Sequence, residues 1–275
     1  MKAKFINDKL DYVFVNDCNE LTLSDKNCER QKFITNKKTK LFAFDGFFMH
    51  LVFVDNDKAL YYYPLSWQPR TNLVCKQVFD ESIDSIAVNK DYVFVNCGCN
   101  IYLLLDYFRD SSSSPIRKIT LESPPAKLEA SDDWLVCVDS MFVHVYDLKS
   151  TLSSAYAMIP HNVHHDIYSV QLSGNICEII SSQATLIHRI NIKEKQILPS
   201  SKLGFMSRNV LVHEYSSPFT VVISDNTIHL FNSERNDEHK TIPINSPVST
   251  ARIVKNKLCL LHFSTTDSVE FLDMM

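Results

Sequence analysis

Glycine is scarce in this sequence, which has only four glycines among 275 residues. Four scattered glycines cannot form the glycine-rich loop that holds phosphate groups in nucleotide-binding proteins. The G-x-S-x-G turn of serine hydrolases and the H-E-x-x-H motif of zinc proteases are absent as well. The sequence therefore carries no local signature of these three classes of enzyme, and we expect no catalytic residues.

Long apolar runs are also missing. No segment approaches the roughly 18 apolar residues that a membrane-spanning helix requires. The N-terminal stretch M-K-A-K-F-I-N-D-K lacks the apolar core of a secretory signal peptide. The net charge of −4 gives no general attraction to nucleic acid or to acidic membranes. We expect a cytoplasmic or nuclear protein without a membrane partner.

Cysteine is more frequent, but its pattern does not indicate a metal site. Most of the eight cysteines lie in apolar runs such as W-L-V-C-V-D, where cysteine is typically a small buried side chain. Cys97 and Cys99 are not followed by a second pair at zinc-finger spacing. The segment P-H-N-V-H-H-D-I (160–167) is better explained as a polar loop than as a zinc site. We therefore predict reduced thiols, no metal, no cofactor and no small-molecule substrate.

One short hairpin pattern recurs along the chain. The hexapeptide D-Y-V-F-V-N occurs at 11–16 and again at 91–96. Related strand-like segments, rich in β-branched and aromatic residues, are each followed by a polar turn and a second strand. The predicted segments begin near Tyr12, Leu51, Tyr92, Trp134, Ile176, Phe219 and Leu258. No segment shows the period and the caps of a long helix.

Seven hairpins at a spacing of about 40 residues are typical of a β-propeller with one four-stranded blade per repeat. We predict an all-β, seven-bladed propeller forming a single domain over residues 1–275, in which the two hexapeptides are the same strand of the first and third blades. The predicted blades are 2–36, 39–80, 83–122, 125–160, 165–198, 207–244 and 247–275. A pair of β-sandwiches uses similar strands but lacks the seven-fold period, and six blades remain possible if one end is misassigned. Asp and Asn in the turns can replace glycine because they tolerate left-handed backbone.

Three segments carry a resemblance to a known family. I-S-D-N-T-I-H-L-F-N (223–232), V-D-S-M-F-V-H-V-Y-D-L (138–148) and S-V-E-F-L-D (268–273) resemble the end of a WD40 repeat. The usual Trp-Asp pair is replaced in each, for example by Phe231-Asn232, and the usual Gly-His pair is absent. The chain is thus similar to a diverged WD40-like propeller. This resemblance implies a non-catalytic scaffold or adaptor subunit that binds partner proteins in a multiprotein complex.

The two ends of the chain raise the question of how the last blade is completed. The segment A-K-F-I-N (3–7) precedes Tyr12 as S-I-A-V-N (85–89) precedes Tyr92, which predicts that it is the first strand of the first blade. The last blade would then lack its fourth strand. Its open edge could accept a strand from a partner through Ser268, Val269, Glu270, Phe271 and Leu272. Alternatively, the N-terminal segment completes this blade, or three strands suffice because Asp267, Glu270 and Asp273 protect the edge.

Basic residues in several loops suggest a second function. They are Arg30, Lys32, Lys37, Lys38, Lys40, Lys202 and Arg208. If these side chains gather on one face of the propeller, that face would attract an acidic protein or the phosphates of RNA or DNA. The alternative function is therefore an accessory subunit of a nucleic-acid-processing complex, such as a tRNA-modifying one. Solvated loops with scattered lysines explain the same residues without any function.

A third possibility, an enzyme with its site in a central channel, needs polar residues on the first strand of each blade. The candidates are Glu129, Gln171, His213, Glu214 and Arg252. These residues do not form a repeated set, so the sequence does not favour an enzyme.

Overall fold

The computed structural model describes residues 2–5, 9–15, 21–27, 31–35, 39–45, 50–55, 58–64, 74–105, 116–150, 155–161, 163, 167–181, 186–202, 210–224, 226–235, 238–255, 257–262 and 268–274. The described residues form β-strands, turns and one short 3₁₀ helix, Ser233–Arg235. None of the described segments is a helix long and apolar enough to cross a membrane.

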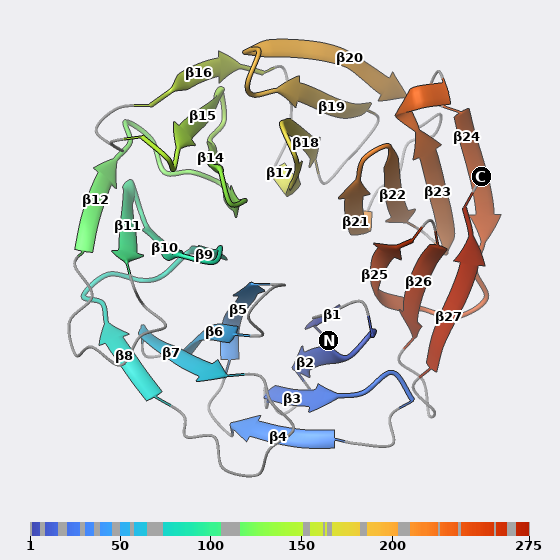
Figure 1. Ribbon diagram of the computed structural model, residues 1–275, viewed down its shortest axis with the longest axis horizontal. Coiled ribbons are helices and arrows are strands. Elements are labelled where there is room, and N and C mark those ends of the chain that lie inside the picture. Colours follow the sequence, from blue (N-terminus) through green and yellow to red (C-terminus); the bar gives the residue numbers. More distant parts are fainter. Residues whose placement is uncertain are drawn as a thin grey trace. The chain divides into compact units, whose positions relative to one another are not determined.

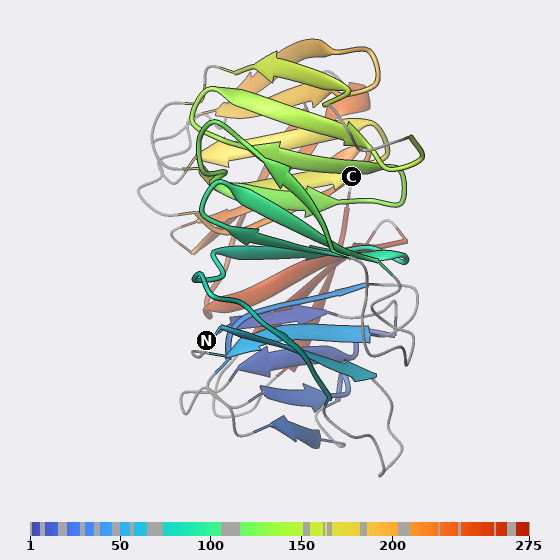
Figure 2. The same ribbon diagram turned by 90° about the vertical axis from the view of Figure 1, so that its left-hand side faces the viewer.

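The described strands form seven antiparallel sheets, in which neighbouring strands follow one another in the chain. The first sheet contains β1 (Lys2–Phe5), β2 (Tyr12–Val15), β3 (Leu21–Ser24) and β4 (Gln31–Thr35). The second contains β5 (Thr39–Asp45), β6 (His50–Asp55), β7 (Ala59–Pro64) and β8 (Val74–Val78). The third contains β9 (Ser85–Val88), β10 (Tyr92–Cys97), β11 (Asn100–Leu105) and β12 (Ile116–Thr120). In Figure 2, the third sheet is drawn in teal to green and faces the viewer with its outer strand, β12.

The later sheets repeat this arrangement until the last. The fourth contains β13 (Lys127–Ala130), β14 (Trp134–Val138), β15 (Phe142–Asp147) and β16 (Ala157–Pro160). The fifth contains β17 (Ile167–Ser173), β18 (Ile176–Ser181), β19 (Leu186–Asn191) and β20 (Gln196–Lys202). The sixth contains β21 (Val210–Ser216), β22 (Phe219–Ser224), β23 (Thr227–Asn232) and β24 (Glu238–Pro243). The seventh contains β25 (Val248–Val254), β26 (Lys257–His262) and β27 (Ser268–Asp273), so it has three strands within the described residues.

This architecture confirms the predicted all-β, seven-bladed propeller; within the described residues the seventh sheet has three strands and each of the other six has four. The second strand of each sheet begins at the predicted residue or one residue before it, as β6 does at His50. The two hexapeptides are indeed the second strands of the first and third sheets. The chain divides into two compact units, residues 1–135 with 147–153 and residues 136–146 with 154–275, and the division falls within the fourth sheet. The assignment of all 275 residues to one domain stays a prediction.

Apolar runs form the second strands because both faces of these strands are buried. In β6, Leu51 and Phe53 belong to an apolar cluster with residues of β2 and β3. Val52 and Val54, on the opposite face, belong to a second cluster with residues of β10. Successive side chains of a strand point to opposite faces, so a strand between two sheets needs apolar residues at every position. Apolar clusters of this kind lie between the first and second, the second and third, the fifth and sixth, and the sixth and seventh sheets.

The turns are built partly as predicted. The side-chain oxygen of Asn89 accepts hydrogen bonds from the backbone N–H groups of Asp91 and Tyr92, which closes the β9–β10 turn. Left-handed backbone occurs at Asn226, but also at Lys58, Lys195 and Lys255. The prediction that Asp and Asn would supply this conformation is therefore right for only some turns, because lysine occupies several of them.

Candidate functional site

The last strand of the seventh sheet is the predicted strand-addition edge. β27 pairs antiparallel with β26, from Lys257 opposite Asp273 to His262 opposite Ser268. Within the described residues, the sheet order is β25-β26-β27 and no fourth strand is present. Figure 1 shows β27 (red) on the side of β26 that faces away from β25. The five residues predicted from the sequence thus lie on a strand for which the described part of the chain supplies one neighbouring strand, β26.

The side chains of β27 differ between its two faces. Leu272 packs against the apolar cluster that joins the sixth and seventh sheets. On the same face, His262 Nε2 donates a hydrogen bond to Glu270 Oε2 at 2.9 Å. On the other face, Phe271 leaves 50% of its surface exposed, and Asp273 contacts Lys257 at 3.3 Å. The edge is therefore held in place on one face and presents an apolar side chain on the other.

The first strand of the chain does not complete this sheet. β1 pairs with β2 over four residues, from Lys2 opposite Val15 to Phe5 opposite Tyr12. The prediction that the N-terminal segment is the first strand of the first blade is confirmed. The alternative, in which this segment supplies the fourth strand of the last blade, is wrong for β1.

The predicted basic face is only partly described. Lys40 donates hydrogen bonds from Nζ to the carbonyl of Ile83 at 2.7 Å and to Ser82 Oγ at 3.2 Å, so it connects β5 to the segment before β9. Lys202 is exposed at the end of β20, and the backbone of Lys32 lies in β4. The remaining predicted residues, Arg30, Lys37, Lys38 and Arg208, lie outside the described residues. The cationic face stays a prediction.

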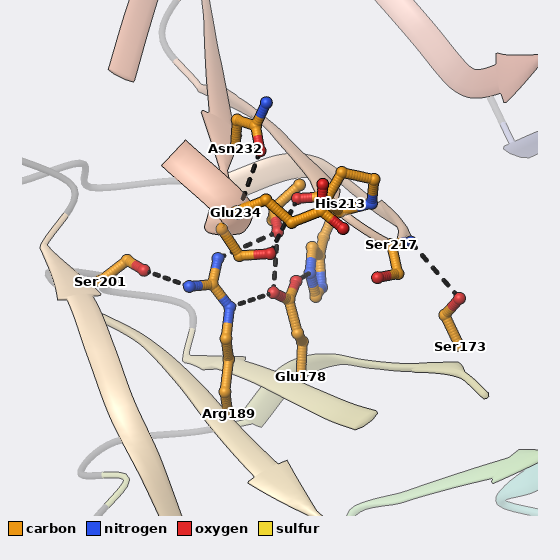
Figure 3. Close-up of polar contacts among 11 residues, drawn as sticks. Ser173, Glu178, Arg189, Ser201, His213, Ser217, Asn232 and Glu234 are labelled. Atoms are coloured by element: carbon orange, nitrogen blue, oxygen red, sulfur yellow. Dashed lines mark hydrogen bonds and ion pairs between the residues drawn. The ribbon is translucent and has the colours of Figure 1, made fainter. Parts of the chain in front are cut away.

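A buried group of charged side chains joins the fifth and sixth sheets (Figure 3). Glu178 of β18 is fully buried, and its Oε1 accepts hydrogen bonds from Arg189 Nε at 2.6 Å and from Thr220 Oγ1 at 2.7 Å. Its other oxygen, Oε2, lies 3.3 Å from His213 Nε2. Arg189 also donates from Nη1 to Ser201 Oγ at 2.6 Å. We call Glu178, Arg189, Ser201, His213 and Thr220 the buried polar cluster.

The buried polar cluster is suited to holding two sheets together rather than to catalysis. Three of its members come from the fifth sheet, and two, His213 and Thr220, come from the sixth. All five side chains are buried, so a substrate would have no access to the carboxylate of Glu178. A buried charge requires a partner and hydrogen bonds, and Arg189 and Thr220 supply them. One atom, His213 Nδ1, is buried without a hydrogen-bond partner in the structure as described.

Sequence reasoning identified only one member of this cluster. His213 was a candidate for a channel site, whereas Glu178 and Arg189 were missed. Their signal is a charged residue in the middle of an apolar strand, as in I-C-E-I-I and L-I-H-R-I. The structure assigns His213 to the contact between the fifth and sixth sheets. Another channel candidate, Glu129, has its pKa raised by burial, and the charge of Lys4 opposes this shift.

A third histidine and carboxylate pair, after His262 with Glu270 and His213 with Glu178, lies within one hairpin of the fourth sheet. Asp139 Oδ1 accepts hydrogen bonds from the backbone N–H groups of Met141 and Phe142, each at 2.7 Å, and Oδ2 accepts one from His144 Nε2 at 2.8 Å. His161 donates from Nε2 to the carbonyl of Asp139, and its Nδ1 accepts from the backbone N–H of Val163. Both histidines thus stabilise the turn between β14 and β15.

No group of three or more potential metal ligands occurs among the residues that the structure describes. His161 belongs to the turn contacts above, and His164, His165 and Asp166 of the same loop lie outside the described residues. Burial, helped by the charges of Glu81 and Asp84, raises the pKa of Cys97 to about 11, which disfavours the reactive thiolate. Burial likewise raises the pKa of Cys137 and Cys259.

Comparison with known proteins identifies the fold. No family model and no curated protein sequence matches the chain. Among solved structures, Kluyveromyces lactis Hsv2 matches with a TM-score of 0.70 at 11% identity, covering 99% of this chain and 97% of that one. Hsv2 of Kluyveromyces marxianus matches with a TM-score of 0.69 at 12% identity, covering 100% and 98%. A chain of the mitotic checkpoint complex matches with a TM-score of 0.70 at 11% identity, covering 98% and 87%.

These matches extend over nearly the whole chain and are WD40 propellers. At such low identity they establish the fold alone. The chain thus has the fold of a WD40-type β-propeller.

Proposed function

We propose that this protein is a non-catalytic scaffold subunit that binds partner proteins in a multiprotein complex. The fold supports this proposal, since propellers of the WD40 type commonly serve as platforms for other proteins, and one structural neighbour belongs to a multiprotein complex. Fold alone is weak support for a function, so the proposal depends on a feature of the surface.

The observation that carries the proposal is the exposure of apolar side chains on the last strands of several sheets. Val78 of β8 is 65% exposed, Met158 of β16 is 53% exposed, and Ile197 of β20 is 50% exposed. Phe271 of β27 is exposed to the same degree. Single exposed apolar residues are common, but their recurrence on sheet edges offers anchors of the kind that protein interfaces bury.

The neighbourhood of Met158 and Ile197 adds cationic groups to these anchors. Lys195 Nζ lies 4.2 Å from the centre of the Tyr156 ring, and the Tyr156 hydroxyl donates a hydrogen bond to the carbonyl of Lys193. These contacts connect the segment before β16 to the turn before β20. An aromatic ring beside lysines, flanked by exposed apolar residues, suits a protein surface that is both apolar and acidic.

The test is isolation of the tagged protein from its own cells, followed by gel filtration and mass spectrometry. We expect one or more proteins to co-elute with it in fixed stoichiometry, from a cytoplasmic or nuclear extract. In the double variant M158D/I197D, we expect these proteins to be lost while the melting temperature is nearly unchanged, because both side chains are exposed. E194Q, on the exposed turn before β20, serves as the control. Elution as a free monomer without any stoichiometric partner would contradict the proposal.

A further inference from the structure

We propose that β27 accepts an extended segment of a partner protein, which adds to the seventh sheet as its fourth strand. This inference rests on the proposed scaffold function and names where and how one partner binds. The other six described sheets supply the template, because each has a fourth strand that runs antiparallel to the third. The position beside β27 is thus the one that β24 occupies beside β23 in the sixth sheet.

The register of the seventh sheet shows which backbone groups of β27 point outward. Val254 and Lys257 are paired across a two-residue turn. The two residues that flank such a turn exchange hydrogen bonds, so Lys257 directs its N–H and C=O toward β25. Because these directions alternate along a strand, Leu258 directs its groups toward β27, where Leu272 is its partner. Val269, Phe271 and Asp273 therefore direct theirs away from β26.

Hydrogen bonds in the fourth, fifth and sixth sheets confirm this alternation of inward-pointing and outward-pointing backbone groups. In each sheet, the residue directly after the third strand donates its N–H to the carbonyl of the residue directly before the second strand. The bonds run from Leu148 to Asp133, from Ile192 to Asn175 and from Ser233 to Pro218. The same register makes Val145 of the fourth sheet equivalent to Phe271. The carbonyl of Val145 accepts a hydrogen bond from the N–H of Tyr156, beside the fourth strand, as the inference requires.

Side-chain exposure marks the same position as unusual. The equivalents of Phe271 in the fourth, fifth and sixth sheets are Val145, Arg189 and Leu230, which are 0%, 5% and 1% exposed. Phe271 itself is 50% exposed. A fourth strand would flank the Phe271 ring as well as bond to its backbone. One added segment would thus satisfy the edge and cover much of this apolar surface.

The charges of β27 indicate the chemistry of the segment. The strand carries two acidic residues, Glu270 and Asp273, and no basic residue. Opposite charges across a strand pair are stabilising, and like charges are destabilising. The partner segment should therefore be extended, about six residues long, with β-branched or apolar residues opposite Val269 and Phe271 and a lysine or arginine near Asp273. A second copy of β27 fits less well, because it would bring carboxylates together.

Amide hydrogen exchange provides the test, and β27 contains its own control. The three outward amides, of Val269, Phe271 and Asp273, should exchange about tenfold or more faster in the isolated protein than the inward amides of Glu270 and Leu272. In the complex isolated from cells, all of them should exchange slowly. Fast outward exchange in an intact stoichiometric complex would overturn this inference and leave the scaffold function standing. Slow outward exchange in the isolated protein at every concentration would show that the chain itself covers the edge.

Two substitutions at one position separate the backbone from the side chain. F271P removes the N–H that residue 271 directs away from β26. An edge strand tolerates proline at such a position, because this N–H does not pair with the neighbouring strand. F271A keeps the N–H. F271P should reduce the recovered partner to about a tenth or less, and F271A should have a clearly smaller effect. Slow exchange at Leu272 in F271P would show that β27 still pairs with β26. Equal losses in both variants would overturn strand addition, because the side chain alone would then carry the binding. Protection that grows with the protein's own concentration would identify a second copy as the occupant instead.

Discussion

β23 and β27 are third strands of neighbouring sheets, and they differ in what lies beside them. Both pair with the preceding strand over six residues, and equivalent residues of the two strands direct their backbone groups toward that strand. Leu230 of β23 is 1% exposed and has β24 alongside, whereas its equivalent in β27, Phe271, is 50% exposed. The local patterns T-I-H-L-F-N and S-V-E-F-L-D are similar, so the strand itself does not determine its burial. The neighbouring elements do.

The sixth sheet is also tied to the fifth by charged groups, which adds to the contrast. Glu178 and Thr220 are 42 residues apart in the sequence and bond directly across the two sheets. β27 has one ion pair, between Asp273 and Lys257, and one hydrogen bond from His262 to Glu270, but both carboxylates are at least half exposed. Exposed pairs contribute little to stability, whereas removal of one partner from a buried pair is costly. We therefore expect substitutions in the buried polar cluster between the fifth and sixth sheets to affect folding, and substitutions in β27 to affect binding.

The largest effect is expected for E178Q. The amide cannot balance the charge of Arg189, which would remain buried without a carboxylate. The free energy of unfolding should fall by about 3–5 kcal/mol. Urea denaturation followed by circular dichroism measures this change. E194Q, on an exposed turn, should change it by less than about 0.5 kcal/mol. A loss of similar size in both variants would show that the buried polar cluster does not hold the sheets together.

Truncation at the two equivalent positions compares β23 with β27 directly. L230A creates a cavity between the sixth and seventh sheets and should cost about 2–5 kcal/mol. F271A removes a side chain that is half exposed and should cost about 1 kcal/mol or less in the isolated protein. The same denaturation measurement checks both variants. Equal costs would mean that the exposed surface of Phe271 is covered in solution.

A smaller effect is expected in the hairpin of the fourth sheet, whose polar contacts are local. D139A removes the acceptor of two backbone hydrogen bonds and of one from His144, and should lower the free energy of unfolding by about 2 kcal/mol. D132A, at an exposed turn position, should cost less than about 0.5 kcal/mol. If the two variants are equally stable, the bonds of Asp139 are replaced by water.

The smallest effect depends on pH and concerns β23. Burial, together with the charge of His239, lowers the pKa of His229 from 6.5 to about 4. The unfolded chain takes up this proton at higher pH than the folded one, so the stability that neutral His229 contributes is complete above pH 6.5 and is lost as the pH falls toward 4.

Melting temperatures between pH 7 and pH 5 measure this dependence. H229Q should reduce the destabilisation over this range by about 1–2 kcal/mol. H188Q, at the comparable position of β19 but less buried, is the control. An unchanged pH profile in H229Q would assign the dependence to other groups.

The sequence predicted the strands well because the signals for them are local. A second strand between two sheets needs apolar side chains on both faces, and this requirement recurs at each blade, as in Y-V-F-V. Asn89 and Asp139 close their turns through bonds to backbone two and three residues away, which sequence reasoning can anticipate. The left-handed lysines were not predicted, because nothing in their own side chains favours that conformation.

The candidate edge was predicted from the order of the strands, whereas the buried polar cluster was not. Counting strands from Tyr12 and from Leu258 predicted that β1 belongs to the first sheet, with the N-terminal segment as closing strand of the last blade left open as an alternative; the pairing of β1 with β2 decided between them. Glu178 and Arg189 look like ordinary charged residues of strands until the fifth and sixth sheets are seen together. Their partners come from different strands and, for His213 and Thr220, from the next sheet.

The sequence by itself predicted seven blades, the position of their strands and the class of the fold, since strand period and turn chemistry depend on residues close together in the chain. Only the tertiary structure decided which charged side chains are buried and paired and how far Phe271 is exposed. These properties depend on contacts between residues tens of positions apart. A local pattern does not encode the solvent or the neighbour that a side chain meets, and the free energy of a charge or an aromatic ring depends on that environment.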